Sequence, residues 1–381
     1  MAEYLTNTTD LTLVADAIRT KGGTTELLTY PDEFVTAIHA IQTGPELQII
    51  VTVTSGATVT ATKGSLSVSG TSVNGTCTLA VPETGTWSVS ATLGGQTSNT
   101  KTVSITTSYS LTLSFVSSTL NNNEWSVIKS VSDAGQGANY WSIGDRKAVT
   151  LNGKVGHLTL SNYTTYAFII GFNHNASVEG ANRIHFQLAK TALSGGKDVA
   201  LCDSKYNSTV STTGYFSMNS SATNSGGWKS SQMRTKICGT SLSSYSGTII
   251  AVIPAALRAV LKSVTKYTNN TGETTSASAV TTTTDYFFLL SEFEVFGSIS
   301  YANTNEKSKQ AQYAYYSAGN SKIKYKHNGT STAANWWLRS PTASSSASFV
   351  GVSAGTPLVA GGTVSASSSI YSNGFAPGFC V

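Results

Sequence analysis

The chain has 381 residues, enough for two or three domains of ordinary size. Charged residues make up only 11% of it, and serine and threonine supply more than a quarter, so solubility depends on uncharged polar groups. This composition favours β structure with long ordered loops. The net charge is +5, and the one basic run, Lys322-Ile-Lys-Tyr-Lys-His327, suits a solvated strand better than a nucleic-acid interface. Membrane insertion is not expected, because no run approaches ~18 apolar residues.

The four cysteines, Cys77, Cys202, Cys238 and Cys380, are scattered and form no CxxC pair. A metal site or a dense disulfide framework is therefore not predicted. Buried free thiols are favoured, and one bridge among the last three cysteines stays open. We expect no cofactor. The first residues lack a basic region followed by an apolar run, so no Sec signal is expected either.

Residues 1–44 are predicted to form a small helical module. Asp10 is the expected cap of a first helix that ends at 21–23, and Pro31 is expected in the first turn of a second helix, ahead of Asp32 and Glu33. The predicted apolar stripes are Leu11, Val14, Ala17 and Ile18 on the first helix, and Phe34, Ala37, Ile38 and Ile41 on the second. Two short helices bury little surface, so this module should dock on a partner or self-associate.

Residues 45–108 follow a boundary at Gly44-Pro45 and show short alternating strands at 49–53, 65–68, 77–81, 87–91 and 102–105. Turn signals separate the strands at intervals of ~8–12 residues, which is the rhythm of a small immunoglobulin-like β-sandwich. Trp87 is predicted to anchor its core rather than to form an exposed ligand platform.

Residues 109–381 are predicted to form one large α+β domain. Strands rich in aromatic residues are expected at 166–172 and 286–290. A helix is expected to open near Pro254, with Ala256, Val260 and Val264 on one side. Loops rich in asparagine, serine and glycine connect these elements.

No sequence motif for metal-dependent, serine-nucleophile or nucleotide chemistry is present. His174, Glu179 and His185 can in principle ligate a metal or exchange protons, but loop hydrogen bonding is favoured for His174. Glu292 and Glu294 alternate with Phe293, so on a strand both carboxylates would share one face. Such a pair can hydrolyse glycosides, but anchoring of loops or pairing with Arg339 is favoured. The protein is therefore not expected to be an enzyme.

Several motifs carry a resemblance to known families. The leader Asp10-Leu-Thr-Leu-Val-Ala-Asp-Ala-Ile-Arg-Thr-Lys-Gly-Gly23 and the Pro-x-x-Phe helix resemble the start of tail proteins from phages and prophages of Gram-positive gut bacteria. Residues 336–341 (WWLRSP) and 374–381 (GFAPGFCV), together with 172–175 and 291–297, resemble phage and bacterial surface proteins. The ends of those proteins resemble the C-type-lectin-like fold of the formylglycine-generating-enzyme type. The reactive cysteine pair of that enzyme and the calcium signatures of sugar-binding lectins are missing here.

The resemblance implies how these motifs pack. Trp336, Trp337 and Leu338 are expected to fill a central strand, with core packing favoured over sugar stacking for both tryptophans. Arg339 is expected to bridge loops, and Phe379 and Val381 to return into the same sheet.

The segment 341–381 has an unusual amino-acid composition, because it contains no Lys, Arg, Asp, Glu, His, Gln, Met or Trp. Retroelements that randomise adenines in asparagine codons produce such a composition. An ordinary serine-rich loop has it as well, so both interpretations remain open.

These features together predict a phage or prophage tail protein, located in the virion and extracellular after host lysis, that binds a bacterial surface receptor (protein or glycan). Its expected partners are other tail proteins and copies of itself, as a homotrimer. Two alternatives are a bacterial surface adhesin of the same fold and a glycan-processing enzyme using Glu292 and Glu294. The ligand-binding residues are predicted to be Ser345, Ser346, Phe349, Ser353, Ser367, Ser369, Tyr371 and Asn373.

Overall fold

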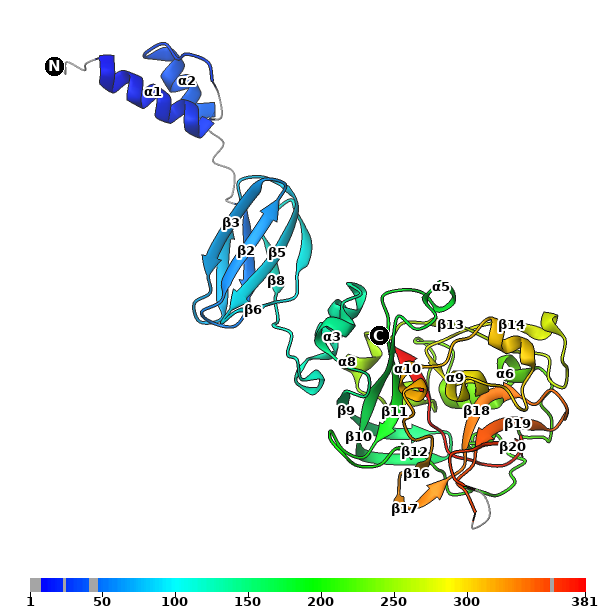
Figure 1. Ribbon diagram of the computed structural model, residues 1–381. Helices are drawn as coiled ribbons and strands as arrows, with labels where there is room; N and C mark the ends of the chain where they lie inside the picture. The colour runs from blue at the N-terminus through cyan, green and yellow to red at the C-terminus, as the bar shows by residue number, and fades with distance from the viewer. Residues whose placement is uncertain (1–7, 23–24, 41–46, 357–359) are drawn as a thin grey trace. The chain divides into compact units, whose positions relative to one another are not determined.

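The computed structural model describes residues 8–22, 25–40, 47–356 and 360–381. It divides the chain into two compact units, residues 1–115 and 116–381 (Figure 1). The first unit holds a helical pair and a β module, and the second holds all the later elements. The protein is therefore multidomain and rich in β structure, as predicted.

The helical pair consists of α1 (Thr8–Gly22) and α2 (Asp32–Ala40). Helix α1 begins two residues before Asp10, so Asp10 is not its cap. Its buried face follows Leu11, Ala15 and Ile18, which pack with Phe34 of α2. The predicted stripes were wrong in part, because Val14, Ala17 and Ile38 are exposed. Ile41, Gly44 and Pro45 lie outside the described residues.

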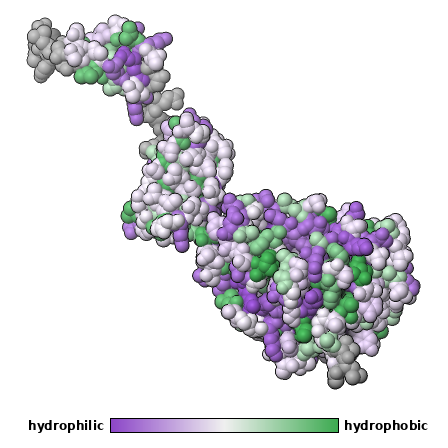
Figure 2. All heavy atoms as spheres, in the orientation of Figure 1, coloured by the Kyte–Doolittle hydropathy of each residue, from purple (hydrophilic) through white to green (hydrophobic). Residues whose placement is uncertain are grey.

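The β module contains two sheets. Their strands are β1 (Gln48–Thr52), β2 (Thr58–Lys63), β3 (Leu66–Thr71), β4 (Thr76–Ala80), β5 (Gly85–Leu93), β6 (Gln96–Thr97), β7 (Lys101–Ile105) and β8 (Tyr109–Thr112). One sheet has the order β4-β1-β8, and the other has β3-β2-β5-β6, with β7 also paired to β5. Strand β2 was missed because its inward residues, Val59 and Ala61, give only a weak alternation. In Figure 2 the surface of this module is mostly pale, as serine and threonine cover it.

Trp87 lies in the shared core of the two sheets and is fully buried, as predicted. Its indole Nε1 donates to the Glu83 carbonyl oxygen at 3.2 Å. Strand β8 pairs in parallel with β1, so the predicted boundary after residue 108 cuts through this module. The structure places the boundary after Phe115. Residues 109–112 are therefore part of the β module and not of the second unit.

The second unit has a five-stranded sheet of order β15-β21-β11-β10-β9. Three smaller sheets accompany it: β18-β19-β20, β12-β16-β17 and the hairpin β13-β14. The strands are β9 (Arg146–Val155), β10 (Leu158–Phe172), β11 (Ile184–Lys190), β12 (Val199–Ala200), β13 (Val264–Asn269), β14 (Val280–Asp285), β15 (Phe287–Phe288), β16 (Lys324–Lys326), β17 (Gly329–Ala334), β18 (Trp336–Pro341), β19 (Ser348–Val352), β20 (Val364–Ser368) and β21 (Gly378–Cys380).

The helices of this unit are short. They are α3 (Trp125–Asp133), α4 (Gly137–Tyr140), α5 (Ala176–Glu179), α6 (Gly227–Ser230), α7 (Ile249–Val252), α8 (Ala255–Arg258), α9 (Glu292–Phe296) and α10 (Ala314–Ser317), with 3-10 turns η1 (Leu120–Asn122), η3 (Ala277–Ala279) and η4 (Thr304–Ser308) and a π-helical turn η2 (Met233–Cys238). The helix expected at Pro254 is the single turn α8, and Val264 belongs to β13 instead. No helix in the described ranges is long and apolar enough to cross a membrane.

One core fills the second unit, and Trp336, Trp337 and Leu338 of β18 are fully buried in it. Phe379 lies in β21, which pairs with β11 and β15. The expectation that the C-terminal strand joins the sheet of Trp336 was therefore wrong; Gly374, which precedes β21, forms an isolated bridge with Trp336. All four cysteines are buried free thiols, as favoured.

Candidate functional site

The predicted ligand-binding segment folds back on the core through β19, which lies between β18 and β20. In β19, residues 349–352 are all buried, whereas most residues of β20 are half-buried. Among the predicted residues, Ser346 and Tyr371 are exposed, whereas Ser345, Ser353 and Ser367 are half-buried.

Three of the predicted ligand-binding residues are buried, and the structure contradicts their assignment. Phe349 fills the core and Ser369 has no exposed surface. The Ser369 hydroxyl donates to the Ser221 carbonyl oxygen at 2.9 Å. Asn373 is 2% exposed, and its backbone N–H donates to the Phe216 carbonyl oxygen at 3.1 Å. These residues hold the segment in place and do not present it.

The long loop 203–230 lies against this segment. A β-bridge joins Thr209 to Tyr371, and the Val210 N–H donates to the Ile370 carbonyl oxygen at 2.8 Å. Asn224 is buried, and its side-chain amide donates to the carbonyl oxygens of Thr342, Ser345 and Ser348 at 3.1, 2.7 and 2.9 Å. The buried Asn224 amide thus fixes the backbone of the 342–348 turn.

We call the exposed residues Thr209, Ser221, Ser346 and Tyr371 the C-terminal loop surface. All four belong to the two interlocked loops, and none carries a charge. Because buried hydrogen bonds order the backbone beneath them, a ligand that binds here loses little loop entropy. The chemistry available is hydroxyl hydrogen bonding plus one aromatic ring.

The interior of the same unit holds a network of buried charges. Lys266 of β13 is fully buried, and its ammonium contacts Glu179 Oε2 at 2.6 Å, Glu294 Oε1 at 3.0 Å and the Tyr313 hydroxyl at 2.8 Å. Arg339 of β18 donates from both Nη atoms to the two oxygens of Glu294. Its Nε donates to Thr268 Oγ1 at 2.7 Å. Arg339 therefore joins strand β13 to helix α9, and not two loops as expected.

The charges of this network shift the pKa values of its members. Although burial alone raises the pKa of Glu294, the charges of Arg339 and Lys266 outweigh it and hold that pKa well below its usual range. Burial raises the pKa of Glu179 to about 7 and lowers that of His174 to about 3. Two cations thus face two carboxyl groups beside a neutral imidazole.

His174, Glu179 and Glu294 lie close enough together to hold a metal ion. The third residue of the sequence-based set, His185, is also near, with Nδ1 3.8 Å from Glu179 Oε2. Both Nε2 atoms of these histidines are buried without a hydrogen-bond partner among the described residues. The Lys266 ammonium, however, already occupies the position between the two carboxylates, and Glu294 accepts bonds on both oxygens. A divalent ion would add uncompensated positive charge, so the residues fit one poorly.

Cys380, His185 and Glu179 also lie side by side in this network. The Cys380 Sγ is 3.3 Å from His185 Nδ1, but the glutamate approaches that same nitrogen. A nucleophile and an orienting acid need opposite ring nitrogens. Burial raises the pKa of the Cys380 thiol to about 12, which keeps it protonated. The arrangement suits a packed core better than covalent catalysis.

Glu292 and Glu294 lie on the one-turn helix α9 and not on a strand. Ser291 and Glu294 form a capping box there. Glu292 accepts backbone N–H bonds from residues 300–302. Both carboxylates are fully buried. They act as the favoured interpretation describes: Glu292 anchors a loop, and Glu294 pairs with Arg339.

The sequence carried signals for residues that were missed. The Ser-x-x-Glu pattern at 291–294 is a capping box, which marks a helix start. Alternation along β13 places Val264, Lys266 and Thr268 on one face, so the core-facing lysine could have been noticed. No local pattern indicated that Tyr313 or Asn224 would reach these positions.

Comparison with known proteins adds one match. Residues 204–381 are similar to a family described as a domain of unknown function (DUF6273). No curated protein and no solved structure matches the chain. The matched range begins inside the second unit, and it omits β9, β10 and β11. Because β11 lies between β10 and β21 in the main sheet, the matched range shares its core with residues 116–203.

Proposed function

We propose that this protein is a phage or prophage tail protein that binds a bacterial surface receptor through the C-terminal loop surface. The proposal rests on two roles that residues in 203–230 and 341–373 play: some order the backbone, and others are exposed to a ligand. Buried Asn224 and Ser369 order the backbone, while uncharged side chains such as Ser346 and Tyr371 are exposed. Ordered loops that present hydroxyls and an aromatic ring resemble antibody paratopes in their physical design.

The same proposal includes a C-type-lectin-like fold for residues 116–381 and an immunoglobulin-like fold for the β module. Two features support this part of the proposal. The C-terminal strand β21 lies inside the five-stranded sheet, and the strand with Trp336, Trp337 and Leu338 is buried, so both can form a scaffold that holds irregular loops. The β module would act as a spacer, and the helical pair would attach to the tail. The virion is the location that this organisation implies.

Hypervariability of 341–381 forms a narrower part of the proposal. Retroelement diversification would tolerate changes at exposed positions such as Ser344, Ser346 and Tyr371. It would not tolerate them at Phe349 or Asn373, which are buried. Sequences of this gene from related phage genomes would therefore vary at the first set and keep the second. Variation spread evenly over both sets would contradict it.

A homotrimer is part of the same proposal. Among the described residues of the helical pair, the buried apolar side chains are Ala15, Ile18 and Phe34. Leu13, Leu27 and Val35 are 63%, 87% and 52% exposed, and so small a core seldom stabilises a module alone. Light scattering of the full chain should give a trimer, and a chain lacking residues 1–44 should give a smaller species. A monomeric full chain at micromolar concentration would overturn this part.

The binding test compares two triple variants of the labelled full chain on a panel of Gram-positive gut bacteria. Thr209→Ala, Ser346→Ala and Tyr371→Ala together should abolish adsorption to a strain that the parent binds. The control, Thr332→Ala, Ser298→Ala and Tyr301→Ala, removes the same residue types from other exposed positions and should bind like the parent. Equal adsorption by both variants would place the receptor site elsewhere.

Flanking genes separate this proposal from a bacterial surface adhesin. Tape-measure, holin or reverse-transcriptase genes beside this one would support the tail protein. Genes for cell-wall anchoring in their place would favour the adhesin.

A further inference from the structure

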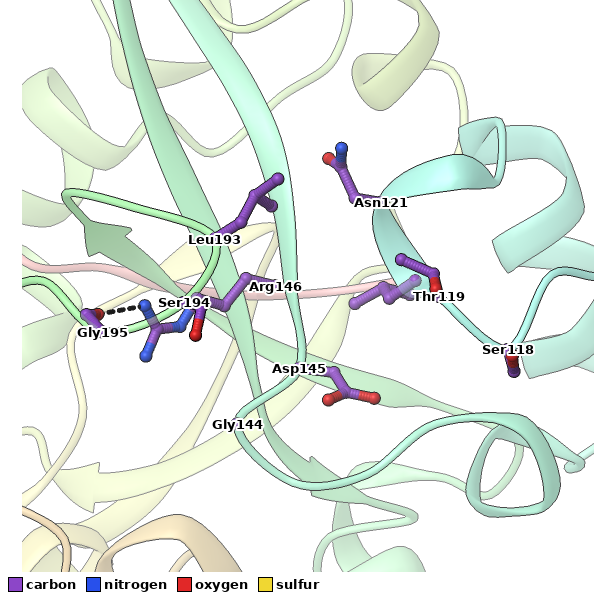
Figure 3. A pocket seen from close by; sticks show the side chains of 10 residues that line it. Ser118, Thr119, Asn121, Gly144, Asp145, Arg146, Leu193, Ser194 and Gly195 are labelled. Carbon is purple, nitrogen blue, oxygen red and sulfur yellow. Dashed lines mark hydrogen bonds between the residues drawn. The ribbon is translucent and has the colours of Figure 1, made fainter.

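A cavity of about 320 Å³ lies at the edge of the five-stranded sheet, where β9 begins. In Figure 3 the 118–121 turn stands on one side of the strand and the 193–195 loop on the other. Small-molecule sites span ~300–1,000 Å³, so this cavity suits one small ligand and not an extended chain. It belongs to different residues from the C-terminal loop surface, which lies near the β18-β19-β20 sheet (Figure 1).

Three polar side chains of the cavity keep unused hydrogen-bonding atoms. Asp145 accepts the Ser142 N–H on Oδ2 at 2.8 Å, and its Oδ1 has no partner among the described residues. Asn121 accepts the Ala148 N–H on Oδ1 at 2.8 Å, which fixes its orientation and leaves the Nδ2 donors available. Each side chain is therefore held by one bond and has its other end free for a ligand.

Arg146 is held in the same way. Its Nη1 donates to the carbonyl oxygens of Ala192 and Gly195, and the second of these bonds is drawn in Figure 3. Its Nε and Nη2 have no partner in the described part of the chain. The guanidinium thus ties the 192–195 loop to the sheet edge, and its Nε and Nη2 remain available as donors in the lining of the cavity.

The charges of the cavity select a class of ligand. One carboxylate and one guanidinium line the cavity, so its lining has no net charge. Such a lining favours a neutral ligand over an anion or a cation. Acceptor and donor groups within one cavity match the hydroxyls of a sugar, each of which both donates and accepts. Leu193, 46% exposed, adds an apolar contact, which suits the C–H face of a sugar ring.

We propose that this cavity binds one neutral monosaccharide unit, with Asp145 accepting and Asn121 and Arg146 donating to its hydroxyls. None of the described residues that line the cavity is aromatic, so the affinity is weak, on the order of 1 mM. Sugar binding here is independent of the proposed receptor site. On a trimer, three such cavities would strengthen attachment to a glycan-coated surface through multivalency.

Saturation-transfer NMR on the full chain tests the proposal. The probes are methyl glucoside, methyl galactoside and methyl N-acetylglucosaminide, with glycine as a zwitterionic comparator and sialic acid as an anionic one. At least one neutral glycoside should bind. Failure of all three to bind, or preferential binding of glycine or sialic acid, would overturn the proposal, since a charge-matched amino acid or an anion would then be the better ligand.

Matched variants locate the binding. Asp145→Asn keeps an oxygen for the Ser142 N–H but removes the free carboxylate oxygen, so glycoside binding should weaken at least tenfold. Glu273→Gln removes the same charge from an exposed position elsewhere and should bind like the parent. Leu193→Trp should tighten binding several-fold by adding a ring platform. An Asp145→Asn protein that folds normally and binds like the parent would place the sugar outside this cavity. The triple variant at Thr209, Ser346 and Tyr371 should keep glycoside binding, which separates failure here from failure of the proposed receptor site.

Discussion

The buried network around Arg339 and the C-terminal loop surface use opposite chemistry within one domain. The network places full charges at Lys266, Glu294 and Arg339, where none of them is exposed. The four side chains of the loop surface carry no charge and present only hydroxyls and a phenol ring. A buried ion pair needs exact geometry, so it fixes one arrangement of strands. Uncharged loops accept substitutions at little cost, so they can change partners while the scaffold stays the same.

The largest expected effect is loss of the Arg339 side chain. Arg339→Met would leave Glu294 buried with one cation fewer, and removing one partner of a buried pair costs about 3–5 kcal/mol of unfolding free energy. Urea denaturation of the full chain, followed by near-ultraviolet circular dichroism, measures the loss.

Two further variants sharpen that result. Lys307→Met removes an exposed cation and should change stability by less than about 0.5 kcal/mol. Combining Arg339→Met with Glu294→Gln should cost less than the sum of the two single changes, because the uncompensated charge is gone. Strict additivity would contradict a coupled network.

A second, smaller effect concerns pH. Burial raises the pKa of Glu306 to about 7, from an ordinary value of 4.5. Between these values the folded protein keeps a proton that the unfolded chain has lost. The stabilising contribution of Glu306 is therefore fully present below about pH 4.5 and is lost as the pH rises through 7.

Glu306→Gln removes this titration and keeps an oxygen for the Asn269 N–H, which Glu306 Oε1 accepts at 2.9 Å. From pH 4.5 to 8, the parent should lose about 3 kcal/mol relative to the variant. Urea midpoints at half-unit pH steps measure this difference. Glu273→Gln, at an exposed site, should run parallel to the parent, and parallel behaviour of Glu306→Gln as well would refute the prediction.

The smallest expected effect on stability belongs to the loop surface. Alanine at Thr209, Ser346 and Tyr371 together should lower the unfolding free energy by less than about 1 kcal/mol, because these side chains are exposed. Asn224→Ala should cost more than all three, since it removes a buried amide that donates to the carbonyl oxygens of Thr342, Ser345 and Ser348. The same denaturation series compares them. If the triple variant were the less stable protein, the loop side chains would be part of the scaffold.

The sequence by itself determined the local features whose causes lie within a few residues. Alternation and turn residues indicated most strands of the β module and Trp87 as its anchor. The apolar run at 336–338 indicated a buried strand. Where the local signal was weak, as at β2, or was misjudged, as at the Ser291–Glu294 capping box, the prediction failed even though the information was partly present.

Only the tertiary structure decided which distant residues meet. Lys266, Glu179 and Arg339 come from three separate segments, and the balance of their charges depends on all three. Asp145, Asn121 and Leu193 line one cavity for the same reason. Exposure was decided in the same way: Asn373 and Ser369 look like surface residues in sequence, but the 203–230 loop covers them. Local patterns encode periodicity, whereas burial and pairing depend on contacts across long stretches of chain, which periodicity does not specify.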